Sequence, residues 1–238
     1  MSTHEPVISV AGIPLQAHLA ELRSRCDAVA RLQGGVAYFH EELGIFLRYA
    51  EERRFFVEIA PAELDRPPDE EGNEHQVWHV AAAKCFLKAT WPDFFGLLVI
   101  HRSNEDPAAS PIAYLERWHL HNEIFGDDVV FLGILRTDQG LRLLIRQPAI
   151  AGLPATHEQI QQFFLENGWL RFVVDGNVAF FDPQRQVVIS DTHRGNIILM
   201  DDGLLAPIDL RVQSVSGALL DSVTKLCSTP DNSPRLSC

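Results

Sequence analysis

The chain has 238 residues, 46% of them hydrophobic, which is enough to bury a substantial core as one bilobal domain or two small ones. Its formal net charge of -12 argues against binding to a nucleic-acid phosphate backbone, because such binding needs a basic face. The longest apolar stretches, residues 94–100 and 178–181, are too short to cross a bilayer, and the N-terminus lacks a signal-peptide pattern. We therefore expect a cytoplasmic protein with no membrane partner. The four cysteines form no CxxC pair, which predicts neither a disulfide framework nor a zinc cluster.

The N-terminal quarter of the chain shows a helical pattern of apolar residues. These residues recur at helical spacing in residues 15–22 and again in residues 43–50, after a break at Gly34. We expect an N-terminal helical extension over residues 1–60, whose role is packing. The charged, proline-containing residues 61–72 indicate a domain boundary.

Short strand-like runs begin near residue 74. Residues 74–80 and 84–90 each alternate polar and apolar side chains, and a stretch of alanines connects the two runs. The pattern predicts a pair of antiparallel strands. Lys84 and Lys88 lie on one face of the second strand, because side chains an even number of residues apart point the same way.

The middle of the chain predicts a helix, a hairpin, an extended proline-containing linker, a second helix and a further hairpin. The first helix ends at Gly126, and the second begins at a capping signature that starts with Thr156. The expected ranges are 113–125 for the first helix, 129–135 and 141–146 for the hairpin, 147–154 for the linker, 156–168 for the second helix and 172–181 for the next hairpin.

The stretch of residues 187–209 places polar side chains between strand-like runs. A loop of the form D-x-H-x-G-N begins at Asp191 and ends at Asn196, and an Asp-Gly turn then leads to a second run that ends at Asp209. Asp191, Asn196 and Asp209 would converge at the ends of apolar strands. Carboxylates at such positions serve metal or proton chemistry.

This spacing resembles that of the protein-kinase-like phosphotransferases. In a kinase catalytic loop an Asp is followed by an Asn, and a metal-binding Asp comes one hairpin later. The form D-x-H-x-G-N is also similar to the loop of aminoglycoside and choline type kinases. Ile189 and Ser190 precede Asp191, so the His-Arg of eukaryotic protein kinases is absent.

Across residues 72–209 the order of motifs resembles the compact kinase domains of bacterial and phage polyvalent proteins. The motifs are GxEH, LKAT followed by FFG, YLER with LHN and FGDD, a QPxIxG linker followed by PAT, and DxHxGN. The resemblance implies an α+β, bilobal protein-kinase-like fold with a reduced C-terminal lobe. The implied parts are a minimal kinase-like domain over 61–213, with an N-lobe at about 72–146, a linker at 147–154 and a C-lobe at 155–213. The polar, Ser-rich residues 214–238 are expected to be disordered.

The resemblance further implies phosphoryl transfer from ATP, with Mg²⁺, to a hydroxyl acceptor on a protein or a small molecule. Asp191 would orient the acceptor hydroxyl and take its proton, and Asn196 and Asp209 would hold the Mg²⁺. Lys88 would contact the non-transferred phosphates, with Lys84 as the alternative.

The resemblance also gives roles to a helix and to the linker. Glu116, preferred to Glu123, would position the strand lysine. The adenine edge would be bound by the linker, at Gln147 and through the amide of Ala149 or Ile150, because Pro148 has no amide hydrogen.

Three other functions stay open. A pseudokinase that binds without turnover is favoured by the missing glycine-rich loop, of which residues 72–74 are the only remnant. A nucleotidyl or AMP transferase could use the same scaffold. A hydrolase based on Ser190, His193 and Asp209 is disfavoured, because no nucleophile elbow surrounds Ser190.

Overall fold

The computed structural model describes residues 13–33, 39–58, 60–101 and 107–228, and it has the mixed α+β composition that the sequence predicts. The chain divides into two compact units. Unit 1 comprises the described residues within 1–97 and 108–149, and unit 2 those within 98–107 and 150–238. The chain passes from unit 1 to unit 2 between Ala149 and Ile150, inside the range predicted as the linker. None of the described helices combines the length and apolarity needed to cross a membrane.

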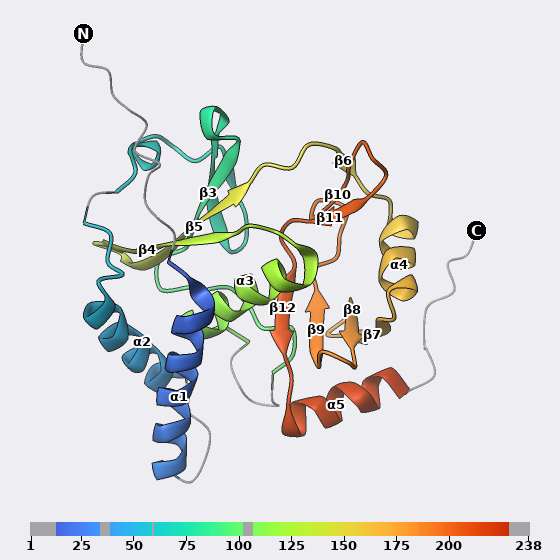
Figure 1. Ribbon diagram of the computed structural model, residues 1–238, viewed down its shortest axis with the longest axis horizontal. Helices are drawn as coiled ribbons and strands as arrows, with labels where there is room; N and C mark the ends of the chain where they lie inside the picture. Colours follow the sequence, from blue (N-terminus) through green and yellow to red (C-terminus); the bar gives the residue numbers. More distant parts are fainter. Residues whose placement is uncertain (1–12, 34–38, 59, 102–106, 229–238) are drawn as a thin grey trace. The chain divides into compact units, whose positions relative to one another are not determined.

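Unit 1 is built on a five-stranded antiparallel sheet with the strand order β1-β2-β3-β5-β4 (Figure 1). The pair β2 and β3 and the hairpin of β4 and β5 confirm the two strand pairs that the sequence predicts. The strands are β1 (Glu70–Glu71), β2 (His75–Val80), β3 (Cys85–Thr90), β4 (Val130–Thr137) and β5 (Gly140–Pro148). Short 3₁₀ turns at Ala62–Asp65 and Ala81–Ala83 precede β1 and connect β2 to β3.

Three helices of unit 1 share one apolar core with β4 and β5. They are α1 (Leu15–Gln33), α2 (Phe39–Arg53) and α3 (Pro111–Phe125), and α1 and α2 lie side by side (Figure 1). Because amphipathic helices must bury their apolar faces, α1 and α2 pack within unit 1, as the packing role expected for the N-terminal helices requires. The bounds predicted for an extension over residues 1–60 stay a prediction. The predicted break at Gly34 lies outside the described residues.

The helix α3 has well-defined ends. The Ser110 hydroxyl accepts the N–H of Ala113 at 3.2 Å, which caps the first turn. Gly126 closes the helix in the left-handed conformation, with φ 68°, as its glycine predicted.

Unit 2 contains two small antiparallel sheets. The first has the order β11-β10-β6, and the second has the order β12-β9-β8-β7. The strands are β6 (Leu153–Pro154), β7 (Leu170–Val174), β8 (Asn177–Asp182), β9 (Val187–Ser190), β10 (Ile197–Leu199), β11 (Leu205–Pro207) and β12 (Arg211–Ser214). The helix α4 (His157–Glu166) begins with the capping box of Thr156 and Gln159 that the sequence indicates.

The C-terminal part of unit 2 corrects one prediction. Residues 214–238 were expected to be disordered, but α5 (Gly217–Ser228) is a helix that packs on the four-stranded sheet (Figure 1). Its buried Val223 and the partly buried Leu219, Leu220 and Cys227 form an apolar stripe with helical spacing. The prediction of disorder rested on the Ser-rich composition, which does not reveal this stripe. Residues 229–238 lie outside the described residues.

Candidate active site

The strand registers of unit 2 bring the ends of two strand pairs together. Ser190, at the end of β9, pairs with Arg211, at the start of β12. Asp191 follows the first of these residues, and Asp209 comes two residues before the second. In the other sheet, Asn196 directly precedes β10, at the open end of the hairpin of β10 and β11.

The side chain of Asn196 ties these strand ends together. Its amide nitrogen lies 2.9 Å from the carbonyl oxygen of Asp191 and 2.9 Å from that of Asp209. A carbonyl oxygen can only accept, so the NH₂ group faces both oxygens and Oδ1 of Asn196 points away from them. The N–H of Ile208 also donates to the Asn196 carbonyl at 2.9 Å. The structure therefore brings the three predicted residues of this loop and hairpin to one place.

Asp191 has an unusual backbone and two basic neighbours. Its φ of 63° is a left-handed conformation that few residues other than glycine adopt. One carboxylate oxygen lies 3.5 Å from Nε2 of His193, and the other lies 3.9 Å from Nε of Arg211. Nδ1 of His193 accepts the N–H of Gly195 at 3.0 Å, so the ring proton sits on Nε2, toward Asp191.

In unit 1, cross-strand pairing places Lys88 in a row of side chains on one face of the sheet, because directly opposed residues share a face. The row runs across all five strands and consists of Glu70, Val77, Lys88, Ile145 and Phe131. Lys88 is only 6% exposed, and its Nζ lies 5.4 Å from the centroid of the Trp118 ring on α3. A lysine this well buried differs from the exposed strand lysine that is the usual fate of this residue type.

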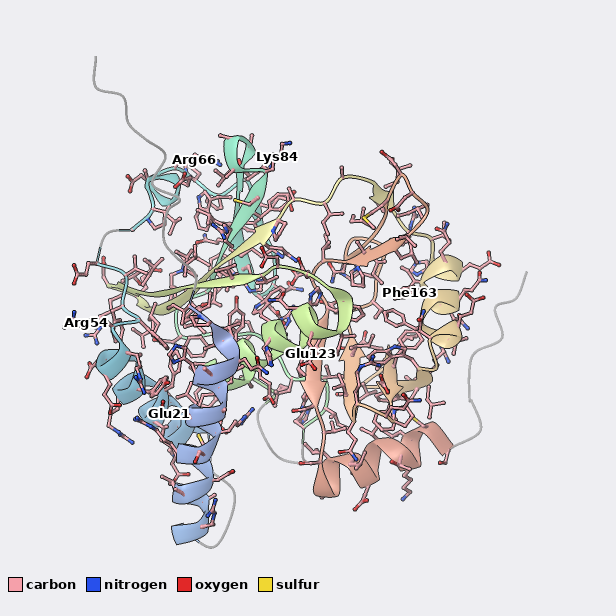
Figure 2. All side chains as sticks on the ribbon, viewed as in Figure 1. Glu21, Arg54, Arg66, Lys84, Glu123 and Phe163 are labelled. Carbon is pink, nitrogen blue, oxygen red and sulfur yellow. The ribbon has the colours of Figure 1, made fainter. Side chains whose placement is uncertain are left out.

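Lys84, the alternative to Lys88, lies elsewhere. It is exposed at the connection of β2 to β3, where Figure 2 labels it, and it has a left-handed φ of 49°. The structure thus separates the two candidates by burial. Lys88 is the one held inside unit 1, which favours Lys88 for the predicted role.

The sheet face that carries Lys88 opens toward β1 into a cavity of about 460 Å³. The rings of His79 and Phe86, which are opposed across β2 and β3, have centroids 5.0 Å apart with 34° between their planes. The lining residues are Asp69, Glu70, Val77, His79 and Phe86. Val77 belongs both to this lining and to the row of Lys88. Beside the His79 and Phe86 rings, this lining carries the two acidic side chains of Asp69 and Glu70.

The two glutamates considered on α3 differ in their surroundings. Glu116 forms an ion pair with Arg23 of α1, which also contacts Glu42 of α2 at 3.3 Å. Glu123, labelled in Figure 2, is exposed, and it lies 3.7 Å from His119. The role of Glu116 toward Lys88 stays a prediction, and its contact with Arg23 connects α3 to the N-terminal helices.

One family model matches the chain. Residues 40–214 match the family described as serine/threonine/tyrosine kinases found in polyvalent proteins. The chain belongs to this kinase family. The resemblance to the kinase domains of polyvalent proteins is therefore confirmed, and with it the kinase-like α+β fold. No curated protein and no solved structure matches the chain, so the likeness of the Asp191 loop to aminoglycoside and choline type kinases stays a prediction.

The residues predicted to hold Mg²⁺ in this kinase-family chain have suitable chemistry. In the described part of the chain, no group of three or more His, Cys, Asp or Glu residues could hold a metal ion. A kinase needs fewer protein ligands, because Mg²⁺ keeps several waters and binds substrate phosphates. Oδ1 of Asn196 and the carboxylate of Asp209 are hard oxygen donors, and the former is turned away from the two carbonyls. The pair fits the predicted metal role.

The residues predicted as a linker that binds the adenine base already use some of their hydrogen-bond donors. The side chain of Gln147 donates to Oδ2 of Asp127 at 2.7 Å, and the N–H of Ala149 donates to the carbonyl of Lys84 at 2.9 Å. The amide of Ala149 is therefore engaged in extending the sheet. Within the residues described, the amide of Ile150 has no acceptor, which leaves Ile150 as the better of the two predicted donors.

Sequence reasoning missed several buried polar contacts of this kinase-family chain. Arg117 of α3 forms an ion pair with Glu74, which directly precedes β2, and both side chains are buried. The hydroxyl of Tyr114 lies 2.9 Å from Nε2 of His75. These residues belong to the GxEH and YLER motifs that carry the resemblance. The presence of both motifs in one chain was the only sequence signal for these contacts. The contacting residues are 39 and 43 positions apart, and no spacing rule predicts contacts at such separations.

Proposed function

We propose that this kinase-family protein transfers the terminal phosphoryl group of ATP to a hydroxyl group on a protein or a small molecule. The observation that carries the proposal is the convergence of Asp191, Asn196 and Asp209 through the two hydrogen bonds of one amide. Phosphoryl transfer needs positioning and charge stabilisation more than covalent chemistry, and a fixed loop supplies both.

Each predicted residue has a distinct task in this proposal. Asp191 accepts a hydrogen bond from the acceptor hydroxyl and takes its proton as the new bond forms. The flanking His193 and Arg211 orient its carboxylate. Asn196 and Asp209 hold Mg²⁺, which when bound neutralises charge on the phosphates. Lys88 donates to the phosphates that are not transferred.

The test is to incubate the protein with Mg-ATP and measure ADP release, phosphate transfer and intact mass. Asp191→Asn and Asp209→Ala are each expected to lower the transfer rate by about two to four orders of magnitude, because they remove the base and a metal ligand. Asp201→Asn is the matched control, because Asp201 is an exposed carboxylate of the same hairpin and its loss should leave the rate unchanged. Equal transfer by the parent and the Asp191→Asn variant would refute the assignment.

The same samples separate the other functions. Binding of Mg-ATP in calorimetry without transfer to any acceptor would indicate a pseudokinase. A gain in mass equal to AMP, in place of phosphate, would indicate nucleotidyl transfer.

A further inference from the structure

The connection between β1 and β2 is short and firmly anchored. It consists of Gly72, Asn73 and Glu74, at the place where the sequence retains only a remnant of a glycine-rich loop. The N–H of Gly72 donates to the carbonyl of His75 at 2.8 Å, and its carbonyl accepts Nε1–H of Trp91 at 3.0 Å. The backbone N–H of Trp91 also donates to the carbonyl of Glu74 at 3.3 Å. These bonds fix both ends of the turn.

The side chain of Glu74 extends this anchoring into the core. Its carboxylate pairs with the Arg117 guanidinium of α3, and the two side chains are only 8% and 6% exposed. The same carboxylate accepts the N–H of Leu97 at 3.2 Å. Gly96 has a φ of 90°, and a Cβ there would lie 3.2 Å from the Glu74 carboxyl group, so a larger residue would disturb the pair. The turn is thus held by α3 and by residues 96–97 together.

Stability alone is a weak reason for this ion pair. Desolvation of two buried charges offsets their attraction, and apolar residues of similar volume often stabilise a fold as well or better. In some proteins a buried polar or charged group instead fixes the register between the elements that it joins. Here it joins the β1–β2 turn to α3.

The joined elements lie next to Lys88. The carbon of the Arg117 guanidinium is 4.9 Å from the Trp118 ring centroid, and Nζ of Lys88 is 5.4 Å from the same centroid. In β2, Val77 follows Glu74 by three residues and pairs directly with Lys88. Asn73 in this turn is exposed, and the backbone N–H of Asn73 has no acceptor in the described part of the chain. An exposed backbone amide at the turn that leads into β2, the strand that pairs with Lys88, suits an anionic phosphate.

We propose that Glu74 and Arg117 are positioning residues that hold the β1–β2 turn beside Lys88, so that ATP phosphates meet a preformed turn instead of a flexible glycine loop. The inference rests on the proposed use of ATP. It extends that proposal by assigning to an ion pair the task that a glycine-rich loop performs in other kinases.

The test compares Glu74→Gln with the parent, both in the Asp191→Asn background so that no turnover occurs. Calorimetry with Mg-ATP measures affinity, and hydrogen exchange measures protection of the Gly72 and Leu97 amides. We expect the dissociation constant for Mg-ATP to rise about tenfold, within the usual range of coupling between linked sites. The amides of Gly72 and Leu97 should exchange faster. Arg117→Lys, which keeps the charge, should show smaller changes in the same direction.

Glu71→Gln is the matched control, because it removes an exposed carboxylate of the same hairpin and leaves the ion pair intact. Its Mg-ATP affinity should stay within about twofold of the parent. Faster amide exchange in Glu74→Gln with unchanged affinity would overturn the inference, because the pair would then only hold structure. Unchanged exchange would also overturn it. Absence of Mg-ATP binding by the parent would instead refute the proposed function itself, and the positioning role with it.

Discussion

At the scale of single residues, Asn196 shows how one side chain can close a loop and present a ligand. Its NH₂ group donates to the backbone carbonyls of Asp191 and Asp209, which belong to different strand ends. The remaining oxygen is then oriented by the bonds that the nitrogen makes. Only asparagine and the longer glutamine carry an NH₂ group with two donor hydrogens next to a carbonyl oxygen that accepts.

This geometry predicts that Asn196→Asp is as harmful as Asn196→Ala, although aspartate is the better Mg²⁺ ligand. A carboxylate has no hydrogen to donate, so it would face two carbonyl oxygens and repel them. We expect either variant to lower the free energy of unfolding by about 1–3 kcal/mol, the usual effect of leaving partners unsatisfied. Phosphate transfer should not recover at high Mg²⁺. Urea unfolding and a Mg²⁺ titration of the transfer rate measure both effects.

Asn177→Asp is the control, because Asn177 is exposed and its side-chain amide donates one hydrogen bond, at 3.2 Å, to the carbonyl of Asp175. It should change neither quantity appreciably. If Asn196→Asp retained full stability and activity, the two hydrogen bonds could not be what brings the loop together.

The site residues that sequence reasoning expected to meet, and that the structure brings together, are close in the chain. Asp191, Asn196 and Asp209 fall within one loop and one hairpin, so local strand pairing and the two hydrogen bonds of the Asn196 side chain are enough to bring them together. No sequence pattern indicated contacts between segments that are far apart in the chain. The pair of Arg23 and Glu116 spans 93 positions and depends on how α1 packs against α3. Only tertiary packing decides such contacts, and the assignment of Glu116 from its spacing alone therefore did not foresee Arg23.

At the scale of elements, local signals decided what could be predicted. The helices α3 and α4 have a glycine stop and a capping box, and the strands β4 and β5 have a turn signal between two apolar runs. The helix α5 has no cap of this kind in its sequence. Its apolar stripe is short and lies among serines, so composition favoured disorder. The apolar stripe of α5 can be recognised only from its packing against the four-stranded sheet.

The packing of α5 predicts that Val223→Ala destabilises unit 2. Val223 is fully buried against the sheet that contains Phe172, Ala179 and Val188. Loss of its two methyl groups should leave a small cavity and cost about 2 kcal/mol, between the usual values for smaller and larger core truncations. Thr224→Ala, at an exposed neighbouring position, should change stability by less than about 0.5 kcal/mol. Equal unfolding midpoints in urea for the two variants would show that α5 does not pack on the sheet.

At the scale of the whole molecule, an acidic chain keeps buried carboxylates ionised in both units. In unit 1 the Asp127 side chain is 3% exposed, and in unit 2 Asp182 is 4% exposed. Burial alone would raise the pKa of each carboxyl group. His121, Gln147 and the N–H of Asp128 outweigh burial and hold the pKa of Asp127 below its ordinary value. Arg185 and the backbone N–H groups of Gln184 and Arg185 do the same for the pKa of Asp182.

These lowered pKa values predict a loss of stability in acid. A carboxyl group with a lower pKa in the folded state stabilises the fold fully above its unfolded pKa of about 3.9, and this contribution disappears as the pH falls through the folded pKa. Asp127→Asn should therefore cost about 1.5–3 kcal/mol at pH 7, the usual value of hydrogen bonds to a charged group, and measurably less at pH 3, where part of the contribution has been lost. Urea unfolding followed by tryptophan fluorescence measures the difference, because Trp78, Trp91 and Trp118 report on unit 1 and Trp169 on unit 2. Asp182→Asn should show the same pH dependence in the Trp169 signal, whereas a variant as destabilised at pH 3 as at pH 7 would show that ionisation of the carboxylate is not the cause.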